Sequence, residues 1–185
     1  VVYETYANGL DRRTPHILMS VSKSMLGLLA GILASRGTLD LSANAESYVP
    51  ELKGSAFEGA SVQNLLDMRA GVLFDEDYLA TSGPIIEYRK STNWNPLGPN
   101  ETPSDLRSFF GSLTETTGAH GGRFDYTSPC TDLMGWVIER ATGRRYADLF
   151  SELIWQPMGA ETSAYITVDR LGAPRAAGGV CIMRL

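Results

Sequence analysis

The sequence predicts a chain of the α/β (α+β) class that is mostly helical, with a remnant of an antiparallel sheet at its ends. The strongest signal is LMSVSKSMLGLLAGILASRG, residues 18–37, which are apolar with helical spacing. Strand signals lie near the ends, in the β-rich residues 1–6 and the alternating residues 162–168. The length of 185 residues suits a single domain. We expect a strand remnant and lead-in over 1–19, a helical region over 20–160 and a return toward the sheet over 161–185.

The first helix is predicted to begin near Ser20 and to end at Gly37, a residue type common just after a helix. A turn at residues 7–9, Ala-Asn-Gly, separates it from the β-rich start. Its apolar side chains cover most of the circumference, so we expect it to be buried nearly all round. These side chains are Met25, Leu26, Leu28, Leu29, Ile32 and Leu33.

Shorter helices are predicted to follow. AESYVPEL, residues 45–52, predicts one turn of helix that Pro50 cuts. Ser61 is placed to cap a helix that Gly71 closes. Residues 74–103 show no clean period, so we expect an irregular stretch of the kind that is often functional or mobile.

The second half of the chain predicts three more helices. Ser104 is placed to cap the first of them, DLRSFFGSL. A glycine-rich loop at 116–122 leads to a helix over 131–141, which Gly143 closes. The last helix, 146–155, is amphipathic.

The composition excludes several classes of function. The chain is 43% hydrophobic and 20% charged, with a net charge of −5 and no basic stripe, so we expect no nucleic acid partner. No apolar run reaches the roughly 18 residues of a membrane span. No metal-binding or nucleotide-binding motif occurs, so no metal and no cofactor are expected. Cys130 and Cys181 are interpreted as free thiols, and with no secretory signal at the start we expect a cytoplasmic location.

Ser20 and Lys23 form a Ser-x-x-Lys motif at the first turn of the most apolar helix. Residues three apart lie on one face of a helix, so the two side chains point the same way. A lysine among apolar groups holds its proton less tightly, because burial disfavours the cation, and it can then take the proton of a serine hydroxyl. The motif predicts a serine nucleophile with a lysine base. The structural alternative is a capping serine followed by a lysine that reaches out to water.

Other residues suggest weaker hypotheses. Tyr126 is expected at a loop tip just before a helix, where its hydroxyl could transfer a proton, or where it could be a half-buried packing residue. Trp94, in the irregular stretch, could line a pocket. A Ser-His-Asp triad with His16 or His120 stays open, although no Gly-x-Ser-x-Gly elbow is present. Residues 75–77, Asp-Glu-Asp, could be paired glycosidase carboxylates but are interpreted as a solvated acidic turn.

Several stretches, in this order, resemble the class C β-lactamase and penicillin-recognising serine hydrolase family. They are SVSKS at 20–24, YTS at 126–128 followed by TDLMGWVIERATGRRY, and LIWQPMGAETSAY at 153–165. Ser-x-x-Lys is a motif of such enzymes. FDEDY, residues 74–78, looks most like the 6-aminohexanoate-dimer hydrolase branch and its esterase relatives. The resemblance covers nearly the whole chain and implies a β-lactamase-like fold.

Carried over by position, the resemblance implies roles for five residues. Ser20 would be the nucleophile, Lys23 its activating base and Tyr126 an aid to proton transfer to the leaving group. Tyr78 and Ser128 would contact the substrate. Because Ser128 stands where lactamases usually have asparagine, efficient lactam hydrolysis is not expected.

The same resemblance narrows the substrate. An acidic residue that pairs with the substrate amine in the nylon-oligomer branch has no clear counterpart between Glu87 and Trp94. We therefore expect a small ester or amide, cleaved through an acyl-enzyme on Ser20. Two other functions stay open, a penicillin-binding, D-peptidase or β-lactamase-type protein, and a catalytically silent fragment of such an enzyme.

The family domain is about twice this length and carries a third motif on a later strand, which the sequence lacks. The chain is therefore expected to be truncated at both ends. The missing sheet strands would come from the rest of a parent chain or from another chain. The final segment RAAGGVCIMRL, residues 175–185, resembles one that runs into another helix.

Overall fold

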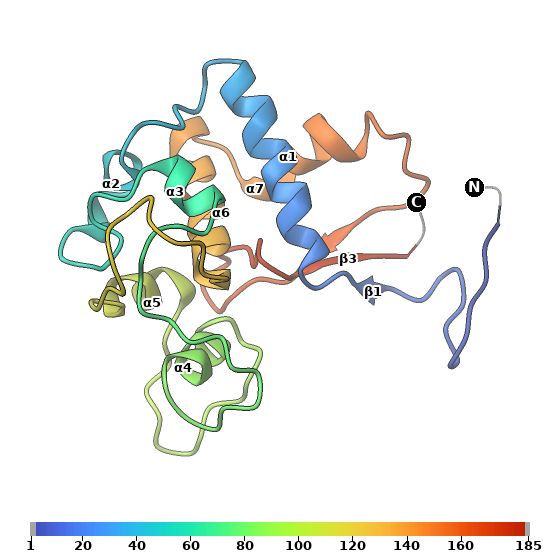
Figure 1. Cartoon of the computed structure of the whole chain (residues 1–185). Coiled ribbons are helices and arrows are strands. Elements are labelled where there is room, and N and C mark those ends of the chain that lie inside the picture. The colour runs from blue at the N-terminus through green and yellow to red at the C-terminus, as the bar shows by residue number, and fades with distance from the viewer. Residues whose placement is uncertain (1–2, 184–185) are drawn as a thin grey trace.

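The computed structural model describes residues 3–183 and gathers the helices around one central helix, with a small sheet to one side (Figure 1). The central helix is α6 (Ser128–Thr142), and every residue from Ser128 to Ile138 is buried. The other helices are α1 (Val21–Ser35), α2 (Ala45–Tyr48), α3 (Val62–Leu66), α4 (Pro84–Ser91), α5 (Leu106–Ser112) and α7 (Tyr146–Phe150), with a 3₁₀ turn at Pro50–Leu52 and a π-helical turn at Ser151–Trp155. The strands are β1 (His16–Ile17), β2 (Tyr165–Ile166) and β3 (Val180–Ile182).

The core forms where the other helices pack on α6, which contacts α1, α2, α3, α5 and α7. Aromatic rings fill the space beside α5. Phe110 stacks on Trp136 with 6.2 Å between ring centroids, and Phe57 meets Phe110 edge-on at 6.3 Å. Such ring pairs add stability beyond the apolar area that they bury. The mostly helical class expected from the sequence is confirmed.

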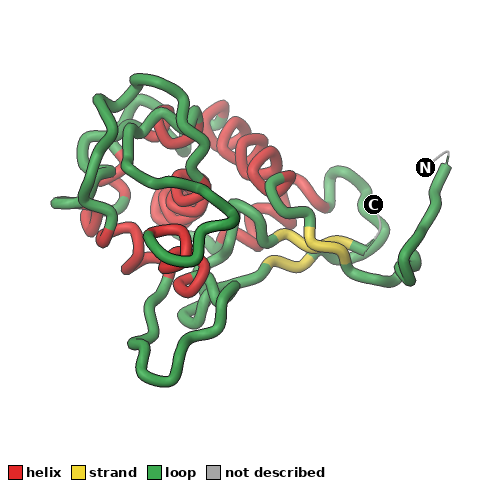
Figure 2. The backbone as a smooth tube through the Cα atoms, turned by 60° about the horizontal axis from the view of Figure 1, so that its bottom comes forward, coloured by secondary structure: helices red, strands yellow, loops and turns green. Residues whose placement is uncertain are grey.

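The sheet has the order β1-β3-β2, and both pairs are antiparallel. Figure 2 shows the three strands side by side at one end of the helical body. Cys181 of β3 lies opposite Ile17 on one side and Tyr165 on the other. Within the segment 175–185, Val180–Ile182 therefore form a strand that is paired on both sides, and the expected run into a helix lies outside the described residues.

The strands differ from the sequence prediction in extent. Residues 3–6 are exposed and form no strand, because no described segment pairs with them, and residues 1 and 2 lie outside the described residues. The turn at 8–9 is confirmed. The predicted strand at 162–168 is reduced to β2, since only these two residues pair with β3.

Helix α1 has the predicted boundaries, with Ser20 as its N-cap and Gly37 in the left-handed conformation just beyond its end. The expectation that it is buried nearly all round is wrong. Leu26, Leu29 and Leu33 face the core, but Val21 and Leu28 are 55% and 54% exposed. The described chain packs against one side of the helix only, which leaves Val21 and Leu28 exposed on the other side.

Other helix predictions hold with local corrections. Ser61 caps α3 in a reciprocal arrangement with Asn64, although the helix ends at Leu66, before Gly71. The cap of α5 is Asp105 and not Ser104, because the Asp105 carboxylate accepts the backbone N–H of Ser108.

The stretch at 74–103, predicted to be irregular, contains α4. Pro84 at the first turn starts this helix, which is eight residues long and too short to show a clear apolar period.

The two serines that flank Lys23, Ser22 and Ser24, lie in different environments. The Ser22 side chain is fully buried, and its Oγ accepts a hydrogen bond of 3.2 Å from the backbone N–H of Val180. Ser22 thus joins α1 to β3, whereas Ser24 is exposed.

Replacing Ser22 by alanine is expected to lower the free energy of unfolding by about 1–3 kcal/mol, because the buried Val180 N–H loses its acceptor. The matched control Ser24→Ala should change it by less than about 0.5 kcal/mol. Urea unfolding followed by circular dichroism measures both. Equal effects of the two substitutions would contradict the bridging role of Ser22.

Both cysteines are free thiols, as expected. Cys130 lies in α6, where burial raises the pKa of its thiol to about 12. Within residues 3–183, no helix is long and apolar enough to cross a membrane. The same residues contain no cluster of three or more His, Cys, Asp or Glu side chains that could hold a metal ion.

Candidate active site

Ser20, Lys23 and Tyr126 come together at the start of α1. Lys23 Nζ lies 3.0 Å from Ser20 Oγ and donates a hydrogen bond to it. The Tyr126 hydroxyl lies 2.7 Å from the same Oγ, although it is 106 residues away in the sequence. Lys23 Nζ also lies 5.1 Å from the centroid of the Tyr126 ring. The Lys23 side chain is therefore directed at the serine and does not reach out to water.

Lys23 is held by a second contact, from the segment that precedes β3. Its Nζ donates a hydrogen bond of 2.8 Å to the carbonyl oxygen of Ala177. Ala177 is fixed in turn by Asp132 of α6, because the Asp132 carboxylate accepts the Ala177 N–H at 2.6 Å. Asp132 also accepts a hydrogen bond from the Tyr88 hydroxyl of α4.

Asp132 is an unusual carboxyl group because it is fully buried. Burial raises its pKa to about 6, against the opposing effects of the hydrogen bonds from Tyr88 and Ala177 and of the nearby charges of Arg175 and Lys23. A buried carboxyl group with a raised pKa, close to a Ser-Lys pair, is typical of functional sites.

The backbone is strained immediately before Ser20. Met19 has a φ of 48°, in the left-handed region that residues with a side chain seldom adopt. Two contacts hold it there, since Leu18 donates its N–H to Val180 O at 2.8 Å and Ser22 donates its own to Met19 O at 3.0 Å. Strain of this kind costs on the order of 1–3 kcal/mol and persists where the surrounding structure fixes it, often at functional sites.

A cavity of about 220 Å³ opens beside Ser20 and Lys23. Tyr78 and Ser128 line it, as a substrate-contacting role requires. Both are held by Glu76, whose carboxylate accepts the Ser128 N–H and O–H and the Tyr78 hydroxyl at 2.7 Å. Partial burial, and then the bond to Glu76, raise the pKa of Tyr78, although the residue as a whole is 61% exposed.

Two arginines that the sequence analysis did not single out also line this cavity, Arg89 of α4 and Arg175 of the segment before β3. Trp94 does not line it and is 47% exposed. Its ring instead lies against the Arg175 guanidinium, with 4.7 Å from Cζ to the ring centroid. Trp94 thus contacts two residues that line the cavity, Arg175 through its ring and Arg89 through its backbone N–H, which donates to Arg89 O at 2.8 Å.

Two interpretations from the sequence, a Ser-His-Asp triad and a solvated acidic turn at 75–77, lose support. His16 lies in β1, and both ring nitrogens of His120 contact the carbonyl oxygens of Ala70 and Glu58, so neither histidine lines the cavity. The acidic turn at 75–77 is not simply solvated, since Glu76 points inward to Ser128.

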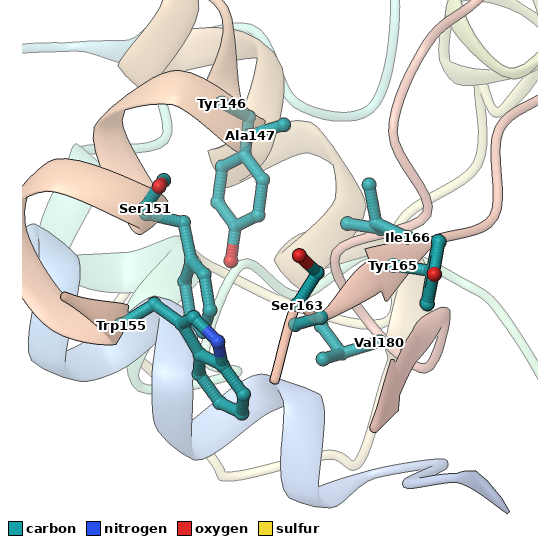
Figure 3. Close-up of a pocket in the computed structure, with 10 residues that line it drawn as sticks. Tyr146, Ala147, Ser151, Trp155, Ser163, Tyr165, Ile166 and Val180 are labelled. Carbon is teal, nitrogen blue, oxygen red and sulfur yellow. The ribbon is translucent and has the colours of Figure 1, made fainter. Parts of the chain in front are cut away.

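A second pocket, of about 170 Å³, lies between the last helical turns and the sheet (Figure 3). Figure 3 shows the rings of Tyr146 and Trp155 on one side of it and Ile166 and Val180 on the other. The residues that line it include none of Ser20, Lys23 and Tyr126. The candidate catalytic residues Ser20 and Lys23 therefore lie at the cavity beside α1 and not at this second pocket.

Comparison with known proteins agrees with this fold. The model of the Beta-lactamase family matches residues 1–180, and the chain belongs to that family. It is 37% identical over 180 residues to the 6-aminohexanoate-dimer hydrolase of Paenarthrobacter ureafaciens, covering 97% of this chain and 45% of that protein. It is 25% identical over 156 residues to esterase EstB of Burkholderia gladioli, covering 82% of this chain and 38% of that esterase.

A solved structure has a similar fold. A Bacillus anthracis protein provisionally described as a 6-aminohexanoate-dimer hydrolase superimposes with a TM-score of 0.87 at 28% identity, covering 98% of this chain and 47% of the other. The resemblance expected from the sequence motifs is thus confirmed, and so is the expected fold. The chain spans about half the length of these relatives.

Proposed function

We propose that the chain carries the nucleophile region of a serine hydrolase that cleaves small esters or amides through an acyl-enzyme on Ser20. The observation that supports this most is the convergence of Lys23 Nζ at 3.0 Å and the Tyr126 hydroxyl at 2.7 Å on one serine oxygen. A serine hydroxyl becomes a useful nucleophile when a base within hydrogen-bond reach can take its proton.

In the proposed reaction, Ser20 Oγ forms a bond to the substrate carbonyl carbon while its proton passes to Lys23 Nζ, the proposed base. The tetrahedral intermediate then expels the alcohol or amine, which receives a proton through Tyr126. Water hydrolyses the resulting ester on Ser20 and restores the free serine. Ser20 is the N-cap of α1, and the positive end of the helix dipole favours the negative charge that develops on the carbonyl oxygen.

Labelling with a fluorophosphonate probe tests the proposed nucleophile. The chain is expected to gain one probe molecule, on Ser20, and Ser20→Ala should gain none. The exposed Ser24→Ala serves as the matched control and should label like the parent chain. Absence of an adduct on Ser20 would contradict the hydrolase and favour a catalytically silent fragment.

The kinetics of a chromogenic ester then separate the remaining possibilities. Continuous release of p-nitrophenol from p-nitrophenyl acetate indicates turnover. A single burst with no later release, together with a stable adduct formed with a penicillin, would instead favour the penicillin-binding or D-peptidase alternative.

We also propose that further strands, from the rest of a longer parent chain or from another chain, complete the sheet and cover α1. Val21 and Leu28 of α1 are exposed, and within residues 3–183 both outer strands, β1 and β2, pair on one side only. Exposed apolar surface next to unpaired strand edges favours such a cover.

A further inference from the structure

We propose that Arg175 forms an anion subsite that selects substrates with a carboxylate on the acyl group. This deepens the proposed function, since it names the chemical class of the substrate at the same cavity. The inference starts from a charged side chain whose hydrogen-bonding capacity is not used.

Arg175 Nε and Nη1 are buried, and neither has a hydrogen-bond partner within the part of the chain that the structure describes. Arg107 also has an unpartnered buried nitrogen, but its guanidinium is paired with Glu139 at 3.0 Å. Arg175 has no such ion pair among the described residues. Asp132 is a nearby opposite charge but makes no hydrogen bond to the guanidinium, so the two buried nitrogens are left to bind an anion from outside.

The surroundings hold Arg175 in place. Its guanidinium lies 4.7 Å from the centroid of the Trp94 ring, an arrangement that favours a cation. Its backbone is fixed on both sides, because its N–H donates to Thr167 O at 2.9 Å and its carbonyl accepts the Gly179 N–H at 2.7 Å. Such a preorganised guanidinium loses little freedom when it binds a carboxylate with two parallel hydrogen bonds.

Arg175 also lies close to the reacting serine. Both residues line the same cavity. A Cβ atom added to Gly178 would lie 3.9 Å from Arg175 Cζ and 3.9 Å from Met19 Cα, so about the width of one small residue separates the guanidinium from the residue before Ser20. A short acyl chain can therefore reach from Ser20 to Arg175.

The charges around the cavity favour an anionic group. Three cationic side chains line it, Lys23, Arg89 and Arg175, against one lining carboxylate, Glu76, and the buried Asp132 near Arg175 and Lys23 does not line it. Glu76 is already bonded to Ser128 and Tyr78, and is not free to pair with a substrate amine. Glu87, on α4, points to Lys90 at 3.2 Å and does not line the cavity.

Two p-nitrophenyl esters of similar length test the subsite, the butyrate, which is neutral, and the mono-ester of glutaric acid, which ends in a carboxylate. The parent chain should hydrolyse the glutarate ester with a kcat/KM about 10- to 100-fold higher. Arg175→Met should reduce that ratio about tenfold or more, and Arg175→Lys, which keeps the charge, should reduce it less. Arg170→Gln, an exposed arginine on the same segment, controls for net charge.

A binding measurement tests the subsite without turnover. On the Ser20→Ala chain, calorimetry should show that monomethyl glutarate binds about tenfold or more tightly than dimethyl glutarate, and that Arg175→Met removes the difference. If Ser20 is not acylated but this binding preference is present, the proposed hydrolase function is wrong and the proposed anion subsite is supported.

Three results would overturn the anion site. They are equal binding of the two glutarates, no ester preference in the parent chain, and an equal loss of both ester activities in Arg175→Met, which would indicate a structural role. Circular dichroism of Arg175→Met and Arg175→Lys shows whether either variant has failed to fold.

Discussion

Replacing Lys23 by methionine is expected to reduce the rate of Ser20 acylation by about 100- to 10,000-fold, the range over which a positioned proton acceptor accelerates such reactions. Methionine has a similar length and no basic atom, so Ser20 would keep its neighbour and lose its base. Lys23 Nζ is the basic group in contact with Ser20 Oγ, whereas the other contact, Tyr126, is a weak base. The rate of p-nitrophenol release from p-nitrophenyl acetate measures the effect.

Lys53→Met is the matched control, because Lys53 is exposed and its replacement removes the same charge. Its rate should equal that of the parent chain. Lys23 also donates to Ala177 O, so a loss in Lys23→Met could arise from a displaced loop. Added methylamine should restore part of the rate to Lys23→Ala if the missing base is the cause. A Lys23→Met chain that reacts as fast as the parent chain would show that another group takes the serine proton.

The part of the site that the sequence could predict is the part formed within one helical turn. Ser20 and Lys23 are three residues apart, and helical geometry alone places them on one face. Local geometry could not place Tyr126 beside Ser20, because this contact depends on how α6 packs against α1. Its hydroxyl was a candidate mainly because the motif order resembles a known family.

The remainder of the site depends on contacts between distant segments. Glu76 meets Ser128 across 52 residues and Asp132 meets Ala177 across 45, and no local pattern marks either pair. Arg175 belongs to no motif that the sequence analysis identified, and only the folded chain places it at the cavity. From the sequence alone, Glu76 looks like a solvated carboxylate of an acidic turn, because no local pattern shows that Ser128 lies beside it.

The fold likewise has features that the local sequence predicts and features that depend on contacts between distant segments. Caps such as Ser61 and Gly143 act within a few residues and were predicted from sequence. The burial of α1 was overestimated, because apolar residues around a helix indicate the surface that can be buried and not whether a partner is present. Leu28 and Leu29 have the same apolar side chain, yet Leu28 is exposed and Leu29 is buried.

Asp132 connects the core to the site, and its loss should have the largest effect on stability. Its carboxylate accepts hydrogen bonds from the Ala177 N–H and the Tyr88 hydroxyl, which both lie in the interior. Asp132→Ala would leave both donors unpaired, and we expect the free energy of unfolding to fall by about 2–4 kcal/mol. Urea unfolding followed by tryptophan fluorescence measures this, with Asp125→Ala in the preceding loop as the control.

Asp132→Asn should behave differently, because it keeps the shape and removes the charge. Burial raises the pKa of Asp132 to about 6, against about 3.9 for an aspartate in an unfolded chain. Between these values the folded chain binds more protons than the unfolded chain, so this carboxyl makes stability decrease as the pH rises from about 4 to 6. In Asp132→Asn that contribution disappears, and its stability relative to the parent chain should increase from pH 4 to pH 7. A constant difference across this range would show that Asp132 does not titrate there.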